Sequence, residues 1–261
     1  MGKAQAIRLG VSAANALVRV ALAPSCAACQ LPLASPLEGC VCPRCWTSIE
    51  PPPQVEWPPD FIAAAAAGGD YTGALRQIVH AFKYDGRRSL AAPLAELMQA
   101  RGSALLADAA WIVPVPLHPW RRLRRGFNQA TDLSRHLRLP VAPILWRHRF
   151  TAAQAGLTAH QRRRNVHNAF AVSPLASRRQ LAAVHGTIAV LVDDVRTTGA
   201  TLHACAEVLA SIGVREVRAL TVAVRAHERA SGSLGSSLVS RSSVADAQGD
   251  LTHRCADARG T

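Results

Sequence analysis

The chain has 261 residues, of which 49% are hydrophobic and 18% charged, and this balance fits a globular core and excludes a chain that is disordered throughout. The formal net charge of +13 indicates anionic partners such as nucleic acid, phosphorylated metabolites or acidic lipid surfaces. No apolar run approaches the roughly 20 residues of a membrane helix, so we expect no membrane span and a cytoplasmic location.

Residues 1–24 are expected to form an N-terminal amphipathic helix. Their apolar content is similar to that of a signal peptide, but Arg8 and Arg19 interrupt the apolar part. The remaining apolar stretch is too short to span a bilayer, which leaves an amphipathic helix as the best interpretation.

Residues 25–50 carry cysteines with the spacing of a small zinc ribbon. They form two CxxC pairs, Cys26 with Cys29 and Cys42 with Cys45. Each CxxC turn directs two sulfur atoms to one side, so two such turns can complete a tetrahedral thiolate shell around Zn²⁺. Ordinary buried thiols and a redox-active CxxC are less favoured alternatives, and Cys40 could replace Cys42 as the ligand. Such a metal would stabilise a module too small to bury a core of its own.

Composition divides the rest of the chain into a linker, a domain and a tail. Five prolines in residues 51–60 exclude regular structure and predict a connector. Residues 61–227 then read as one domain, whereas the Ser- and Gly-rich residues 228–261 lack an apolar period and are expected to be disordered.

Strands alternate with helical patterns in residues 61–227. Apolar spacing predicts two helices between Tyr71 and Gly102, and a third from Thr201 whose stripe includes Cys205. The expected strands are residues 111–117, 141–146, 168–172, 187–192 and 217–224. This alternation predicts an α/β fold with a mostly parallel sheet.

The segment VLVDDVRTTGAT, residues 190–201, places two acids directly after a buried strand. At the carboxyl end of a parallel strand, Asp193 and Asp194 would face the crevice where α/β proteins bind ligands. Ionised carboxylates accept hydrogen bonds from hydroxyl groups or bind a divalent cation, and the Thr/Gly loop with the following helix N-terminus attracts an anion. This combination suggests a sugar phosphate. The alternative is an acidic helix N-cap with threonines that satisfy the first turn.

The same segment resembles the 5-phosphoribosyl 1-pyrophosphate (PRPP) motif of type I phosphoribosyltransferases, which has an aliphatic run, two acids and then Thr-Thr-Gly-x-Thr. The resemblance implies that Asp193 and Asp194 contact the ribose 2′ and 3′ hydroxyls. It also implies that a loop binds the 5′-phosphate, with these residues: Arg196, Thr197, Thr198, Gly199, Ala200 and Thr201.

Further segments extend the resemblance. FKYDGRRSLA (82–91), VPVPLHPWRRLRRGFNQA (113–130) and RFTAAQAGLTAHQRRRNVHNAF (149–170), together with the paired CxxC motifs, are similar to the ComF/GntX family, which is linked to competence and DNA uptake. The resemblance implies a type I phosphoribosyltransferase domain with a Rossmann-like sheet, an N-terminal zinc ribbon, and PRPP bound together with Mg²⁺.

The basic segments suit a leaving group that carries negative charge. Arg121 and Arg125, with Arg122 and Arg124 between them, follow a predicted strand end and could stabilise the pyrophosphate. The alternative is a solvated basic loop or helix start. Residues 149–165 could close as a lid or bind nucleic acid phosphates. Lys83 and Tyr84 match the family pattern without an evident neighbouring site.

Two classes of function follow. The leading hypothesis is a ComF-like protein that binds PRPP and Mg²⁺ and, if it is an enzyme, exchanges pyrophosphate for a nitrogen nucleophile. The rival is a non-catalytic protein that senses PRPP or a nucleotide and binds single-stranded DNA during transformation. A docking role for the zinc ribbon, for example toward a competence helicase, is a third hypothesis.

Overall fold

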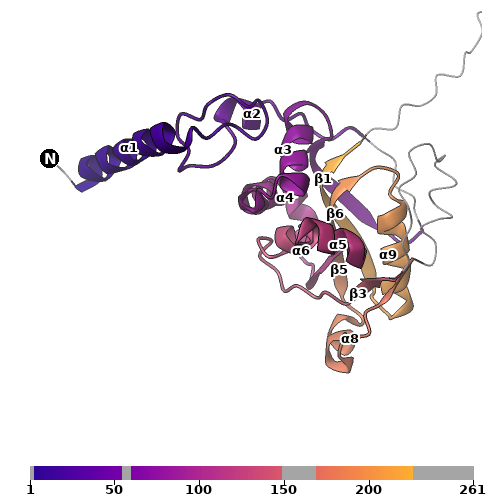
Figure 1. Ribbon diagram of the computed structural model, residues 1–261. Helices are drawn as coiled ribbons and strands as arrows, with labels where there is room; N and C mark the ends of the chain where they lie inside the picture. The colour runs from indigo at the N-terminus through magenta and orange to yellow at the C-terminus, as the bar shows by residue number, and fades with distance from the viewer. Residues whose placement is uncertain (1–2, 55–59, 149–168, 226–261) are drawn as a thin grey trace, which may run out of the picture. The chain divides into compact units, whose positions relative to one another are not determined.

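A parallel sheet forms the centre of the fold (Figure 1). Its four strands are β1 (Ala64–Asp70), β2 (Trp111–Pro114), β5 (Ile188–Arg196) and β6 (Glu216–Val224), in the order β1-β6-β5-β2. The computed structural model describes residues 3–54, 60–148 and 169–225, without the side chains of residues 3–10, 121 and 124. All of these belong to one compact unit, residues 1–227.

Apolar residues on both faces of the inner strands explain why the sheet is covered on both sides. Val190 and Val192 of β5 share one core with α3 (Gly73–Tyr84), α4 (Ala91–Leu106) and α6 (Gln129–Ser134). Ala189 and Leu191 face the opposite core, which includes α9 (Ala200–Ser211). Figure 1 shows α3, α4 and α6 on one side of the sheet and α9 on the other. The predicted mostly parallel α/β fold is therefore confirmed.

Three details differ from the predicted strands. β1 was not predicted, because its alanines and glycines lack the β-branched and aromatic residues typical of strands. Two predicted strands leave the main sheet and pair antiparallel with each other as β3 (Leu145–Arg147) and β4 (Phe170–Val172). β5 continues beyond its predicted end at Val192, because β6 extends beside it and keeps pairing as far as Val224.

Close packing explains why β1 is built from small residues. A Cβ atom on Gly68 would lie 2.7 Å from the Val222 carbonyl oxygen and 3.0 Å from Leu97 of α4. A Cβ atom on Gly69 would lie 2.8 Å from the carbonyl oxygen of Glu50. The edge strand therefore sits too close to its neighbours to carry larger side chains.

The cysteine segment packs into the core that contains α3. Cys26, Leu33 and Cys45 are buried in the same apolar cluster as Ile78 and Phe82 of α3. The chain leaves the segment at Glu50, whose carbonyl accepts a hydrogen bond of 3.1 Å from the N–H of Asp70 at the end of β1. These contacts join the cysteine segment to the sheet and to α3.

The remaining elements are short except for the first. They are α1 (Lys3–Leu22), α2 (Pro43–Thr47), the 3-10 turn η1 (Arg88–Leu90), α5 (Pro119–Arg125) and α8 (Arg178–Val184). Within the described part of the chain, no helix is long and apolar enough to cross a membrane. The expected lid at residues 149–165, residues 55–59 of the expected linker and the expected tail at 228–261 lie outside the described residues.

Candidate functional site

The two adjacent acids of β5 lie on opposite faces of the sheet, because side chains alternate along a strand. Asp194 faces α3, where its Oδ1 lies 2.8 Å from Nζ of Lys83. Only 12% of the Asp194 side chain and 13% of the Lys83 side chain are exposed. Burial alone would lower the pKa of Lys83, but attraction to Asp194 outweighs it and raises that pKa. Lys83 therefore stays in its charged form, and both side chains are largely shielded from solvent.

Asp193 lies on the face covered by α9. Its Oδ1 accepts a hydrogen bond of 2.8 Å from the N–H of Asp194. Burial and the nearby carboxylate of Asp194 raise the pKa of Asp193 to about 7, against the opposing effects of that N–H, Lys83 and Arg147. The two acids thus have different environments, and burial favours the neutral form of Asp193.

Buried polar and thiol groups surround Asp193. Thr221 of β6 is its partner in the strand register and is fully buried. Arg147 is also buried, and its guanidinium carbon lies 5.2 Å from the ring centre of Phe170. Burial raises the pKa of the Cys205 thiol well above its usual value, and Asp193 raises it further. Cys205 is thus the neutral packing thiol that the helical pattern predicted.

The Thr/Gly loop leads directly from β5 into α9. Thr197 is exposed, Thr198 is half-buried, and Gly199 adopts a left-handed conformation with φ of 75°. The Ala200 N–H donates to Thr198 Oγ1 over 3.4 Å, and Thr201 follows in the first turn. Gly199 is the N-cap, and no acidic residue lies in that first turn. The acids belong to the strand, so the alternative of an acidic N-cap does not describe this segment.

Arg196 lies close to Gly199 of this loop. It is 4% exposed, and burial lowers the pKa of its guanidinium. A Cβ atom on Gly199 would lie 3.4 Å from Arg196 Nε, so a larger residue at position 199 would press on this side chain in addition to straining the left-handed backbone.

The basic stretch after β2 forms the short helix α5. His118 caps its start by accepting a hydrogen bond of 3.2 Å from the Trp120 N–H, and Gly126 ends it with φ of 77°. Arg122 is exposed, while the side chains of Arg121 and Arg124 lie outside the described residues.

Arg125 is held by contacts from two helices. Its Nη2 donates to the Tyr84 hydroxyl over 3.0 Å, and its Nη1 donates to Gln129 Oε1 over 3.2 Å. Its guanidinium carbon also lies 4.8 Å from the ring centre of Tyr84. α3 therefore contacts Asp194 of β5 through Lys83 and Arg125 of α5 through Tyr84.

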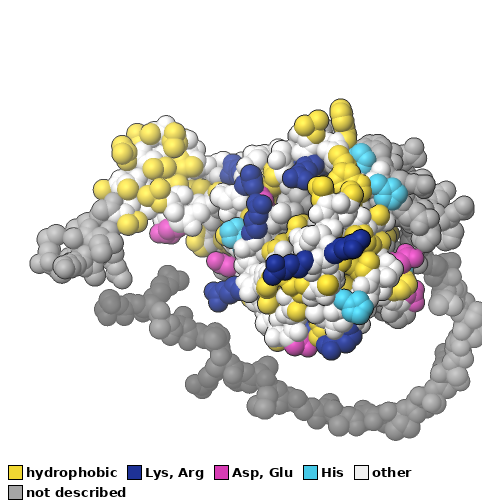
Figure 2. Space-filling model, turned by 90° about the horizontal axis from the view of Figure 1, so that it is seen from below, with side chains coloured by type: hydrophobic (Ala, Val, Ile, Leu, Met, Phe, Trp, Pro, Cys, Tyr) yellow, Lys and Arg dark blue, Asp and Glu magenta, His cyan; other side chains and the backbone are white. Residues whose placement is uncertain are grey.

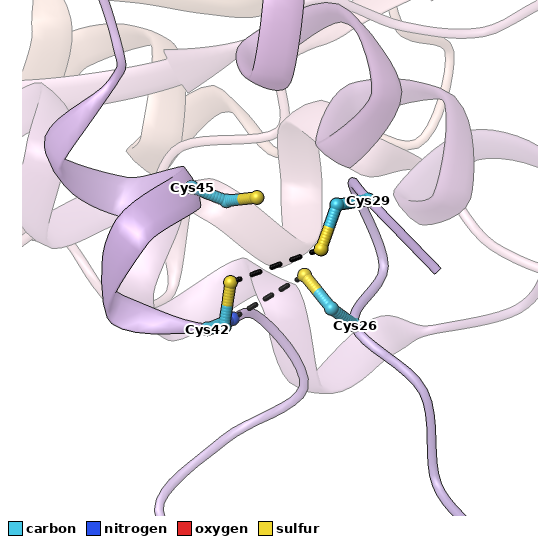
Figure 3. A group of neighbouring side chains, drawn as sticks. All are labelled: Cys26, Cys29, Cys42 and Cys45. Carbon is cyan, nitrogen blue, oxygen red and sulfur yellow. Dashed lines mark hydrogen bonds between the residues drawn. The ribbon is translucent and has the colours of Figure 1, made fainter. Parts of the chain in front are cut away.

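The four paired cysteines come together as a second candidate site. Their sulfur atoms all lie within 4.8 Å of one another (Figure 3): Cys26, Cys29, Cys42 and Cys45. A tetrahedral ion with Zn–S bonds of about 2.3 Å places its sulfur atoms about 3.8 Å apart, close to the 3.9 Å between the sulfurs of Cys29 and Cys42. Cys40 points elsewhere, with its sulfur 3.7 Å from Ser89 Oγ. The group could hold a metal ion such as zinc.

One of these thiols is prepared for metal binding by the backbone. Burial raises the pKa of Cys26, but hydrogen bonds from the N–H groups of Cys42, Cys29 and Ala28 oppose this effect and bring the pKa down to about 6. The thiolate is the form that binds metal, so the fold favours the ligand form of Cys26.

The chain is similar to known proteins. The phosphoribosyl transferase domain model matches residues 123–234. The DNA utilization protein YhgH of Salmonella typhimurium (strain LT2) is 36% identical over 210 residues, 77% of this chain and 82% of that protein. Competence protein F of Haemophilus influenzae is 34% identical over 160 residues, 58% of this chain and 68% of that protein. The chain belongs to the ComF family.

A solved structure is also similar to this ComF family chain. The orotate phosphoribosyltransferase of Aeropyrum pernix matches with 20% sequence identity and a TM-score of 0.32, over 54% of this chain and 75% of that chain. A likeness at this level assigns no function.

In this ComF family chain, the sequence did not reveal the contacts of Lys83 and Tyr84, and it did not single out Arg147. Lys83 and Tyr84 stood in a segment that matches the family pattern, yet their partners Asp194 and Arg125 lie far along the chain. Periodicity and local motifs carry no information about such pairs, so only the packing of α3 against the sheet edge could reveal them.

Proposed function

We propose that this ComF family protein binds PRPP with Mg²⁺ at the carboxyl edge of its parallel sheet. The observation that carries the proposal is the segment from Asp193 to Thr201, which passes from paired carboxylates at the end of β5 through a left-handed glycine into the first turn of α9. This arrangement suits a ribose phosphate, because carboxylates accept from hydroxyl groups and helix N-termini attract phosphate.

Each side chain has a proposed role. Asp193 and Asp194 accept hydrogen bonds from the ribose hydroxyls, and the residues from Thr197 to Thr201 bind the 5′-phosphate. Arg125, and Arg121 on the same helix, bind the pyrophosphate. Arg196 supports the loop, because its side chain is buried close to Gly199.

The proposed metals differ in kind. We assign Zn²⁺ a structural role, held by the four cysteines, whose donor set and spacing fit it. In the described part of the chain, these cysteines are the one group of three or more such ligands close enough to hold a metal. Mg²⁺ would therefore be bound largely by the phosphates of its ligand, as is usual for this ion. It would offset the charge that develops on departing pyrophosphate.

If the protein is an enzyme, the reaction is displacement of pyrophosphate from the ribose by a nitrogen nucleophile. The chain's own part would be to orient the ribose through the acids and to stabilise the leaving group with arginine. Release of pyrophosphate in the presence of a panel of nucleobases measures this activity.

Titration calorimetry with PRPP and Mg²⁺ tests the binding site. Wild-type protein is expected to bind, and the double variant Asp193→Asn/Asp194→Asn is expected to bind at least about 100-fold more weakly, because each charge-assisted hydrogen bond contributes about 1.5–3 kcal/mol. Asp108→Asn is the matched control, since this acid lies in the turn before β2 and pairs with Arg218 near the start of β6, whereas Asp193 and Asp194 lie near the carboxyl end of β5. Wild-type protein without affinity, or a double variant with unchanged affinity, contradicts the proposal.

A second candidate function is single-stranded DNA binding. It is favoured by the names of the two relatives, a DNA utilization protein and a competence protein, and by the net charge of +13. Figure 2 shows Lys and Arg side chains distributed over one face of the domain. Arg122 of α5 is exposed, and Arg88 and Arg135 are exposed but paired with Asp132.

A gel-shift assay in increasing salt tests this candidate. If DNA binds through the arginines of α5, its affinity falls steeply with salt, survives the double Asp variant, and weakens when the four arginines from Arg121 to Arg125 are changed to glutamine. Absence of any shift at low salt excludes the candidate.

A further inference from the structure

The last turn of α3 contacts two separate parts of the proposed ligand site. Lys83 and Tyr84 are adjacent in sequence, but they contact different elements. Lys83 Nζ lies 2.8 Å from Asp194 of β5, and the Tyr84 hydroxyl accepts a 3.0 Å hydrogen bond from Arg125 of α5. The end of α3 thereby contacts Asp194, which is proposed to bind the ribose, and Arg125, which is proposed to bind the pyrophosphate.

The Lys83 contact matters because Asp193 and Asp194 are neighbours. Two carboxylates this close disfavour each other's ionised form. Lys83 places a positive charge beside Asp194 in a position that is largely shielded from solvent, so it offsets this repulsion and fixes the Asp194 carboxylate in one orientation. Without Lys83, the buried Asp194 side chain would lose this salt bridge.

The Tyr84 contact restricts Arg125 instead. The guanidinium is fixed by the Tyr84 hydroxyl, by the Tyr84 ring at 4.8 Å and by Gln129 Oε1 at 3.2 Å. Two of its five N–H donors are engaged in these hydrogen bonds, which leaves donors for an anionic ligand. A cation that is already oriented loses less conformational entropy when it binds.

We propose that Lys83 and Tyr84 are positioning residues that each control one half of the ligand site. Lys83 positions Asp194, which binds the ribose 5-phosphate half of the ligand. Tyr84 positions Arg125, which binds the pyrophosphate half. The inference rests on the proposed function, since it assumes that PRPP is the ligand.

The experiment measures the two halves of the ligand separately. Ribose 5-phosphate, and pyrophosphate with Mg²⁺, are titrated by calorimetry into wild type, Lys83→Met and Tyr84→Leu. Lys83→Met is expected to weaken ribose 5-phosphate at least tenfold while pyrophosphate changes less than threefold. Tyr84→Leu is expected to show the reverse. Arg76→Met is the matched control, because it removes an exposed charge from the same helix, and it should change neither affinity.

Conservative variants keep the test decisive if the first pair unfolds. Lys83→Arg retains the charge and should keep ribose 5-phosphate affinity within threefold of wild type. Tyr84→Phe retains the ring and removes the hydroxyl, so it should weaken pyrophosphate selectively. Equal weakening of both ligands by Lys83 and Tyr84 variants, or no weakening, overturns the inference while PRPP binding by wild type stands. Wild-type protein that binds no PRPP contradicts the proposed function itself.

Discussion

Replacement of Cys26 by serine is expected to release the proposed zinc ion and to destabilise the whole compact unit. Cys26 is fully buried and shares its apolar cluster with Ile78 and Phe82 of α3, so the metal module is part of the main core. A ligand present at about 1,000 times its Kd stabilises the folded state by about 4 kcal/mol. We therefore expect the free energy of unfolding to fall by about 3–4 kcal/mol, measured by urea unfolding together with zinc content by mass spectrometry.

Cys40→Ser is the internal control for this change. Cys40 lies in the same segment, but its sulfur contacts Ser89 and not the four-cysteine cluster. This variant should keep its zinc and lose less than about 1 kcal/mol, the range of a single weak side-chain contact. A metal-free Cys40→Ser protein, or a Cys26→Ser protein with full zinc content, would show that the ligand set is different.

The second large effect is a pH-dependent stabilisation by Asp193→Asn. The pKa of Asp193 is raised from 3.8 to about 7 by burial and by Asp194. Between these two values the folded protein keeps a proton that the unfolded chain has released, so stability falls as pH rises from about 4 to 7 and the full cost is present above pH 7. Asparagine removes this cost. We expect the variant to gain roughly 2–3 kcal/mol more over wild type at pH 8 than at pH 5, because each pH unit between 5 and 7 adds about 1.4 kcal/mol.

Asp108→Asn provides the comparison for this measurement. A hydrogen bond from Arg218 lowers the pKa of Asp108, so the contribution of this acid is lost only as pH falls below its usual value. Its substitution should therefore change stability by the same amount at pH 5 and pH 8. A gain from Asp193→Asn that is independent of pH would show that the pKa of Asp193 is not raised in the folded protein. The same variant is expected to bind PRPP more weakly, since apo stability and ligand binding make opposite demands on this carboxylate.

Local patterns were sufficient to predict part of the molecule. The alternation of strands and helices predicted the parallel sheet, and the CxxC spacing predicted the cluster of four cysteines. Both signals lie within short stretches of chain, where spacing directly limits geometry. The choice between Cys40 and Cys42 needed the fold, because it depends on the contact between Cys40 and Ser89, 49 positions away.

Other features depend on tertiary packing and left no local signal. β1 is a strand because β6 pairs with it and because Gly68 fits closely against Val222 and Leu97. Its own residues favour no strand. The different surroundings of Asp193 and Asp194 follow from the continuation of β5 to Arg196, which places the two carboxylates on opposite faces of the sheet. A strand that ended at Val192, as predicted, would have placed both acids in a loop.

The pairing of β1 with β6 also has a consequence for synthesis on the ribosome. β6 is the last strand of the described chain, so β1 has no partner until Val224 has been translated and has left the exit tunnel. All four cysteines, in contrast, precede β1 in the chain. We expect the nascent chain to capture its metal first and to complete the sheet last. During that interval β1 has no paired strand. Its alanines and glycines make it a poor template for aggregation. We therefore expect the small residues of β1, which gave no strand signal in the sequence, to protect the growing chain from aggregation.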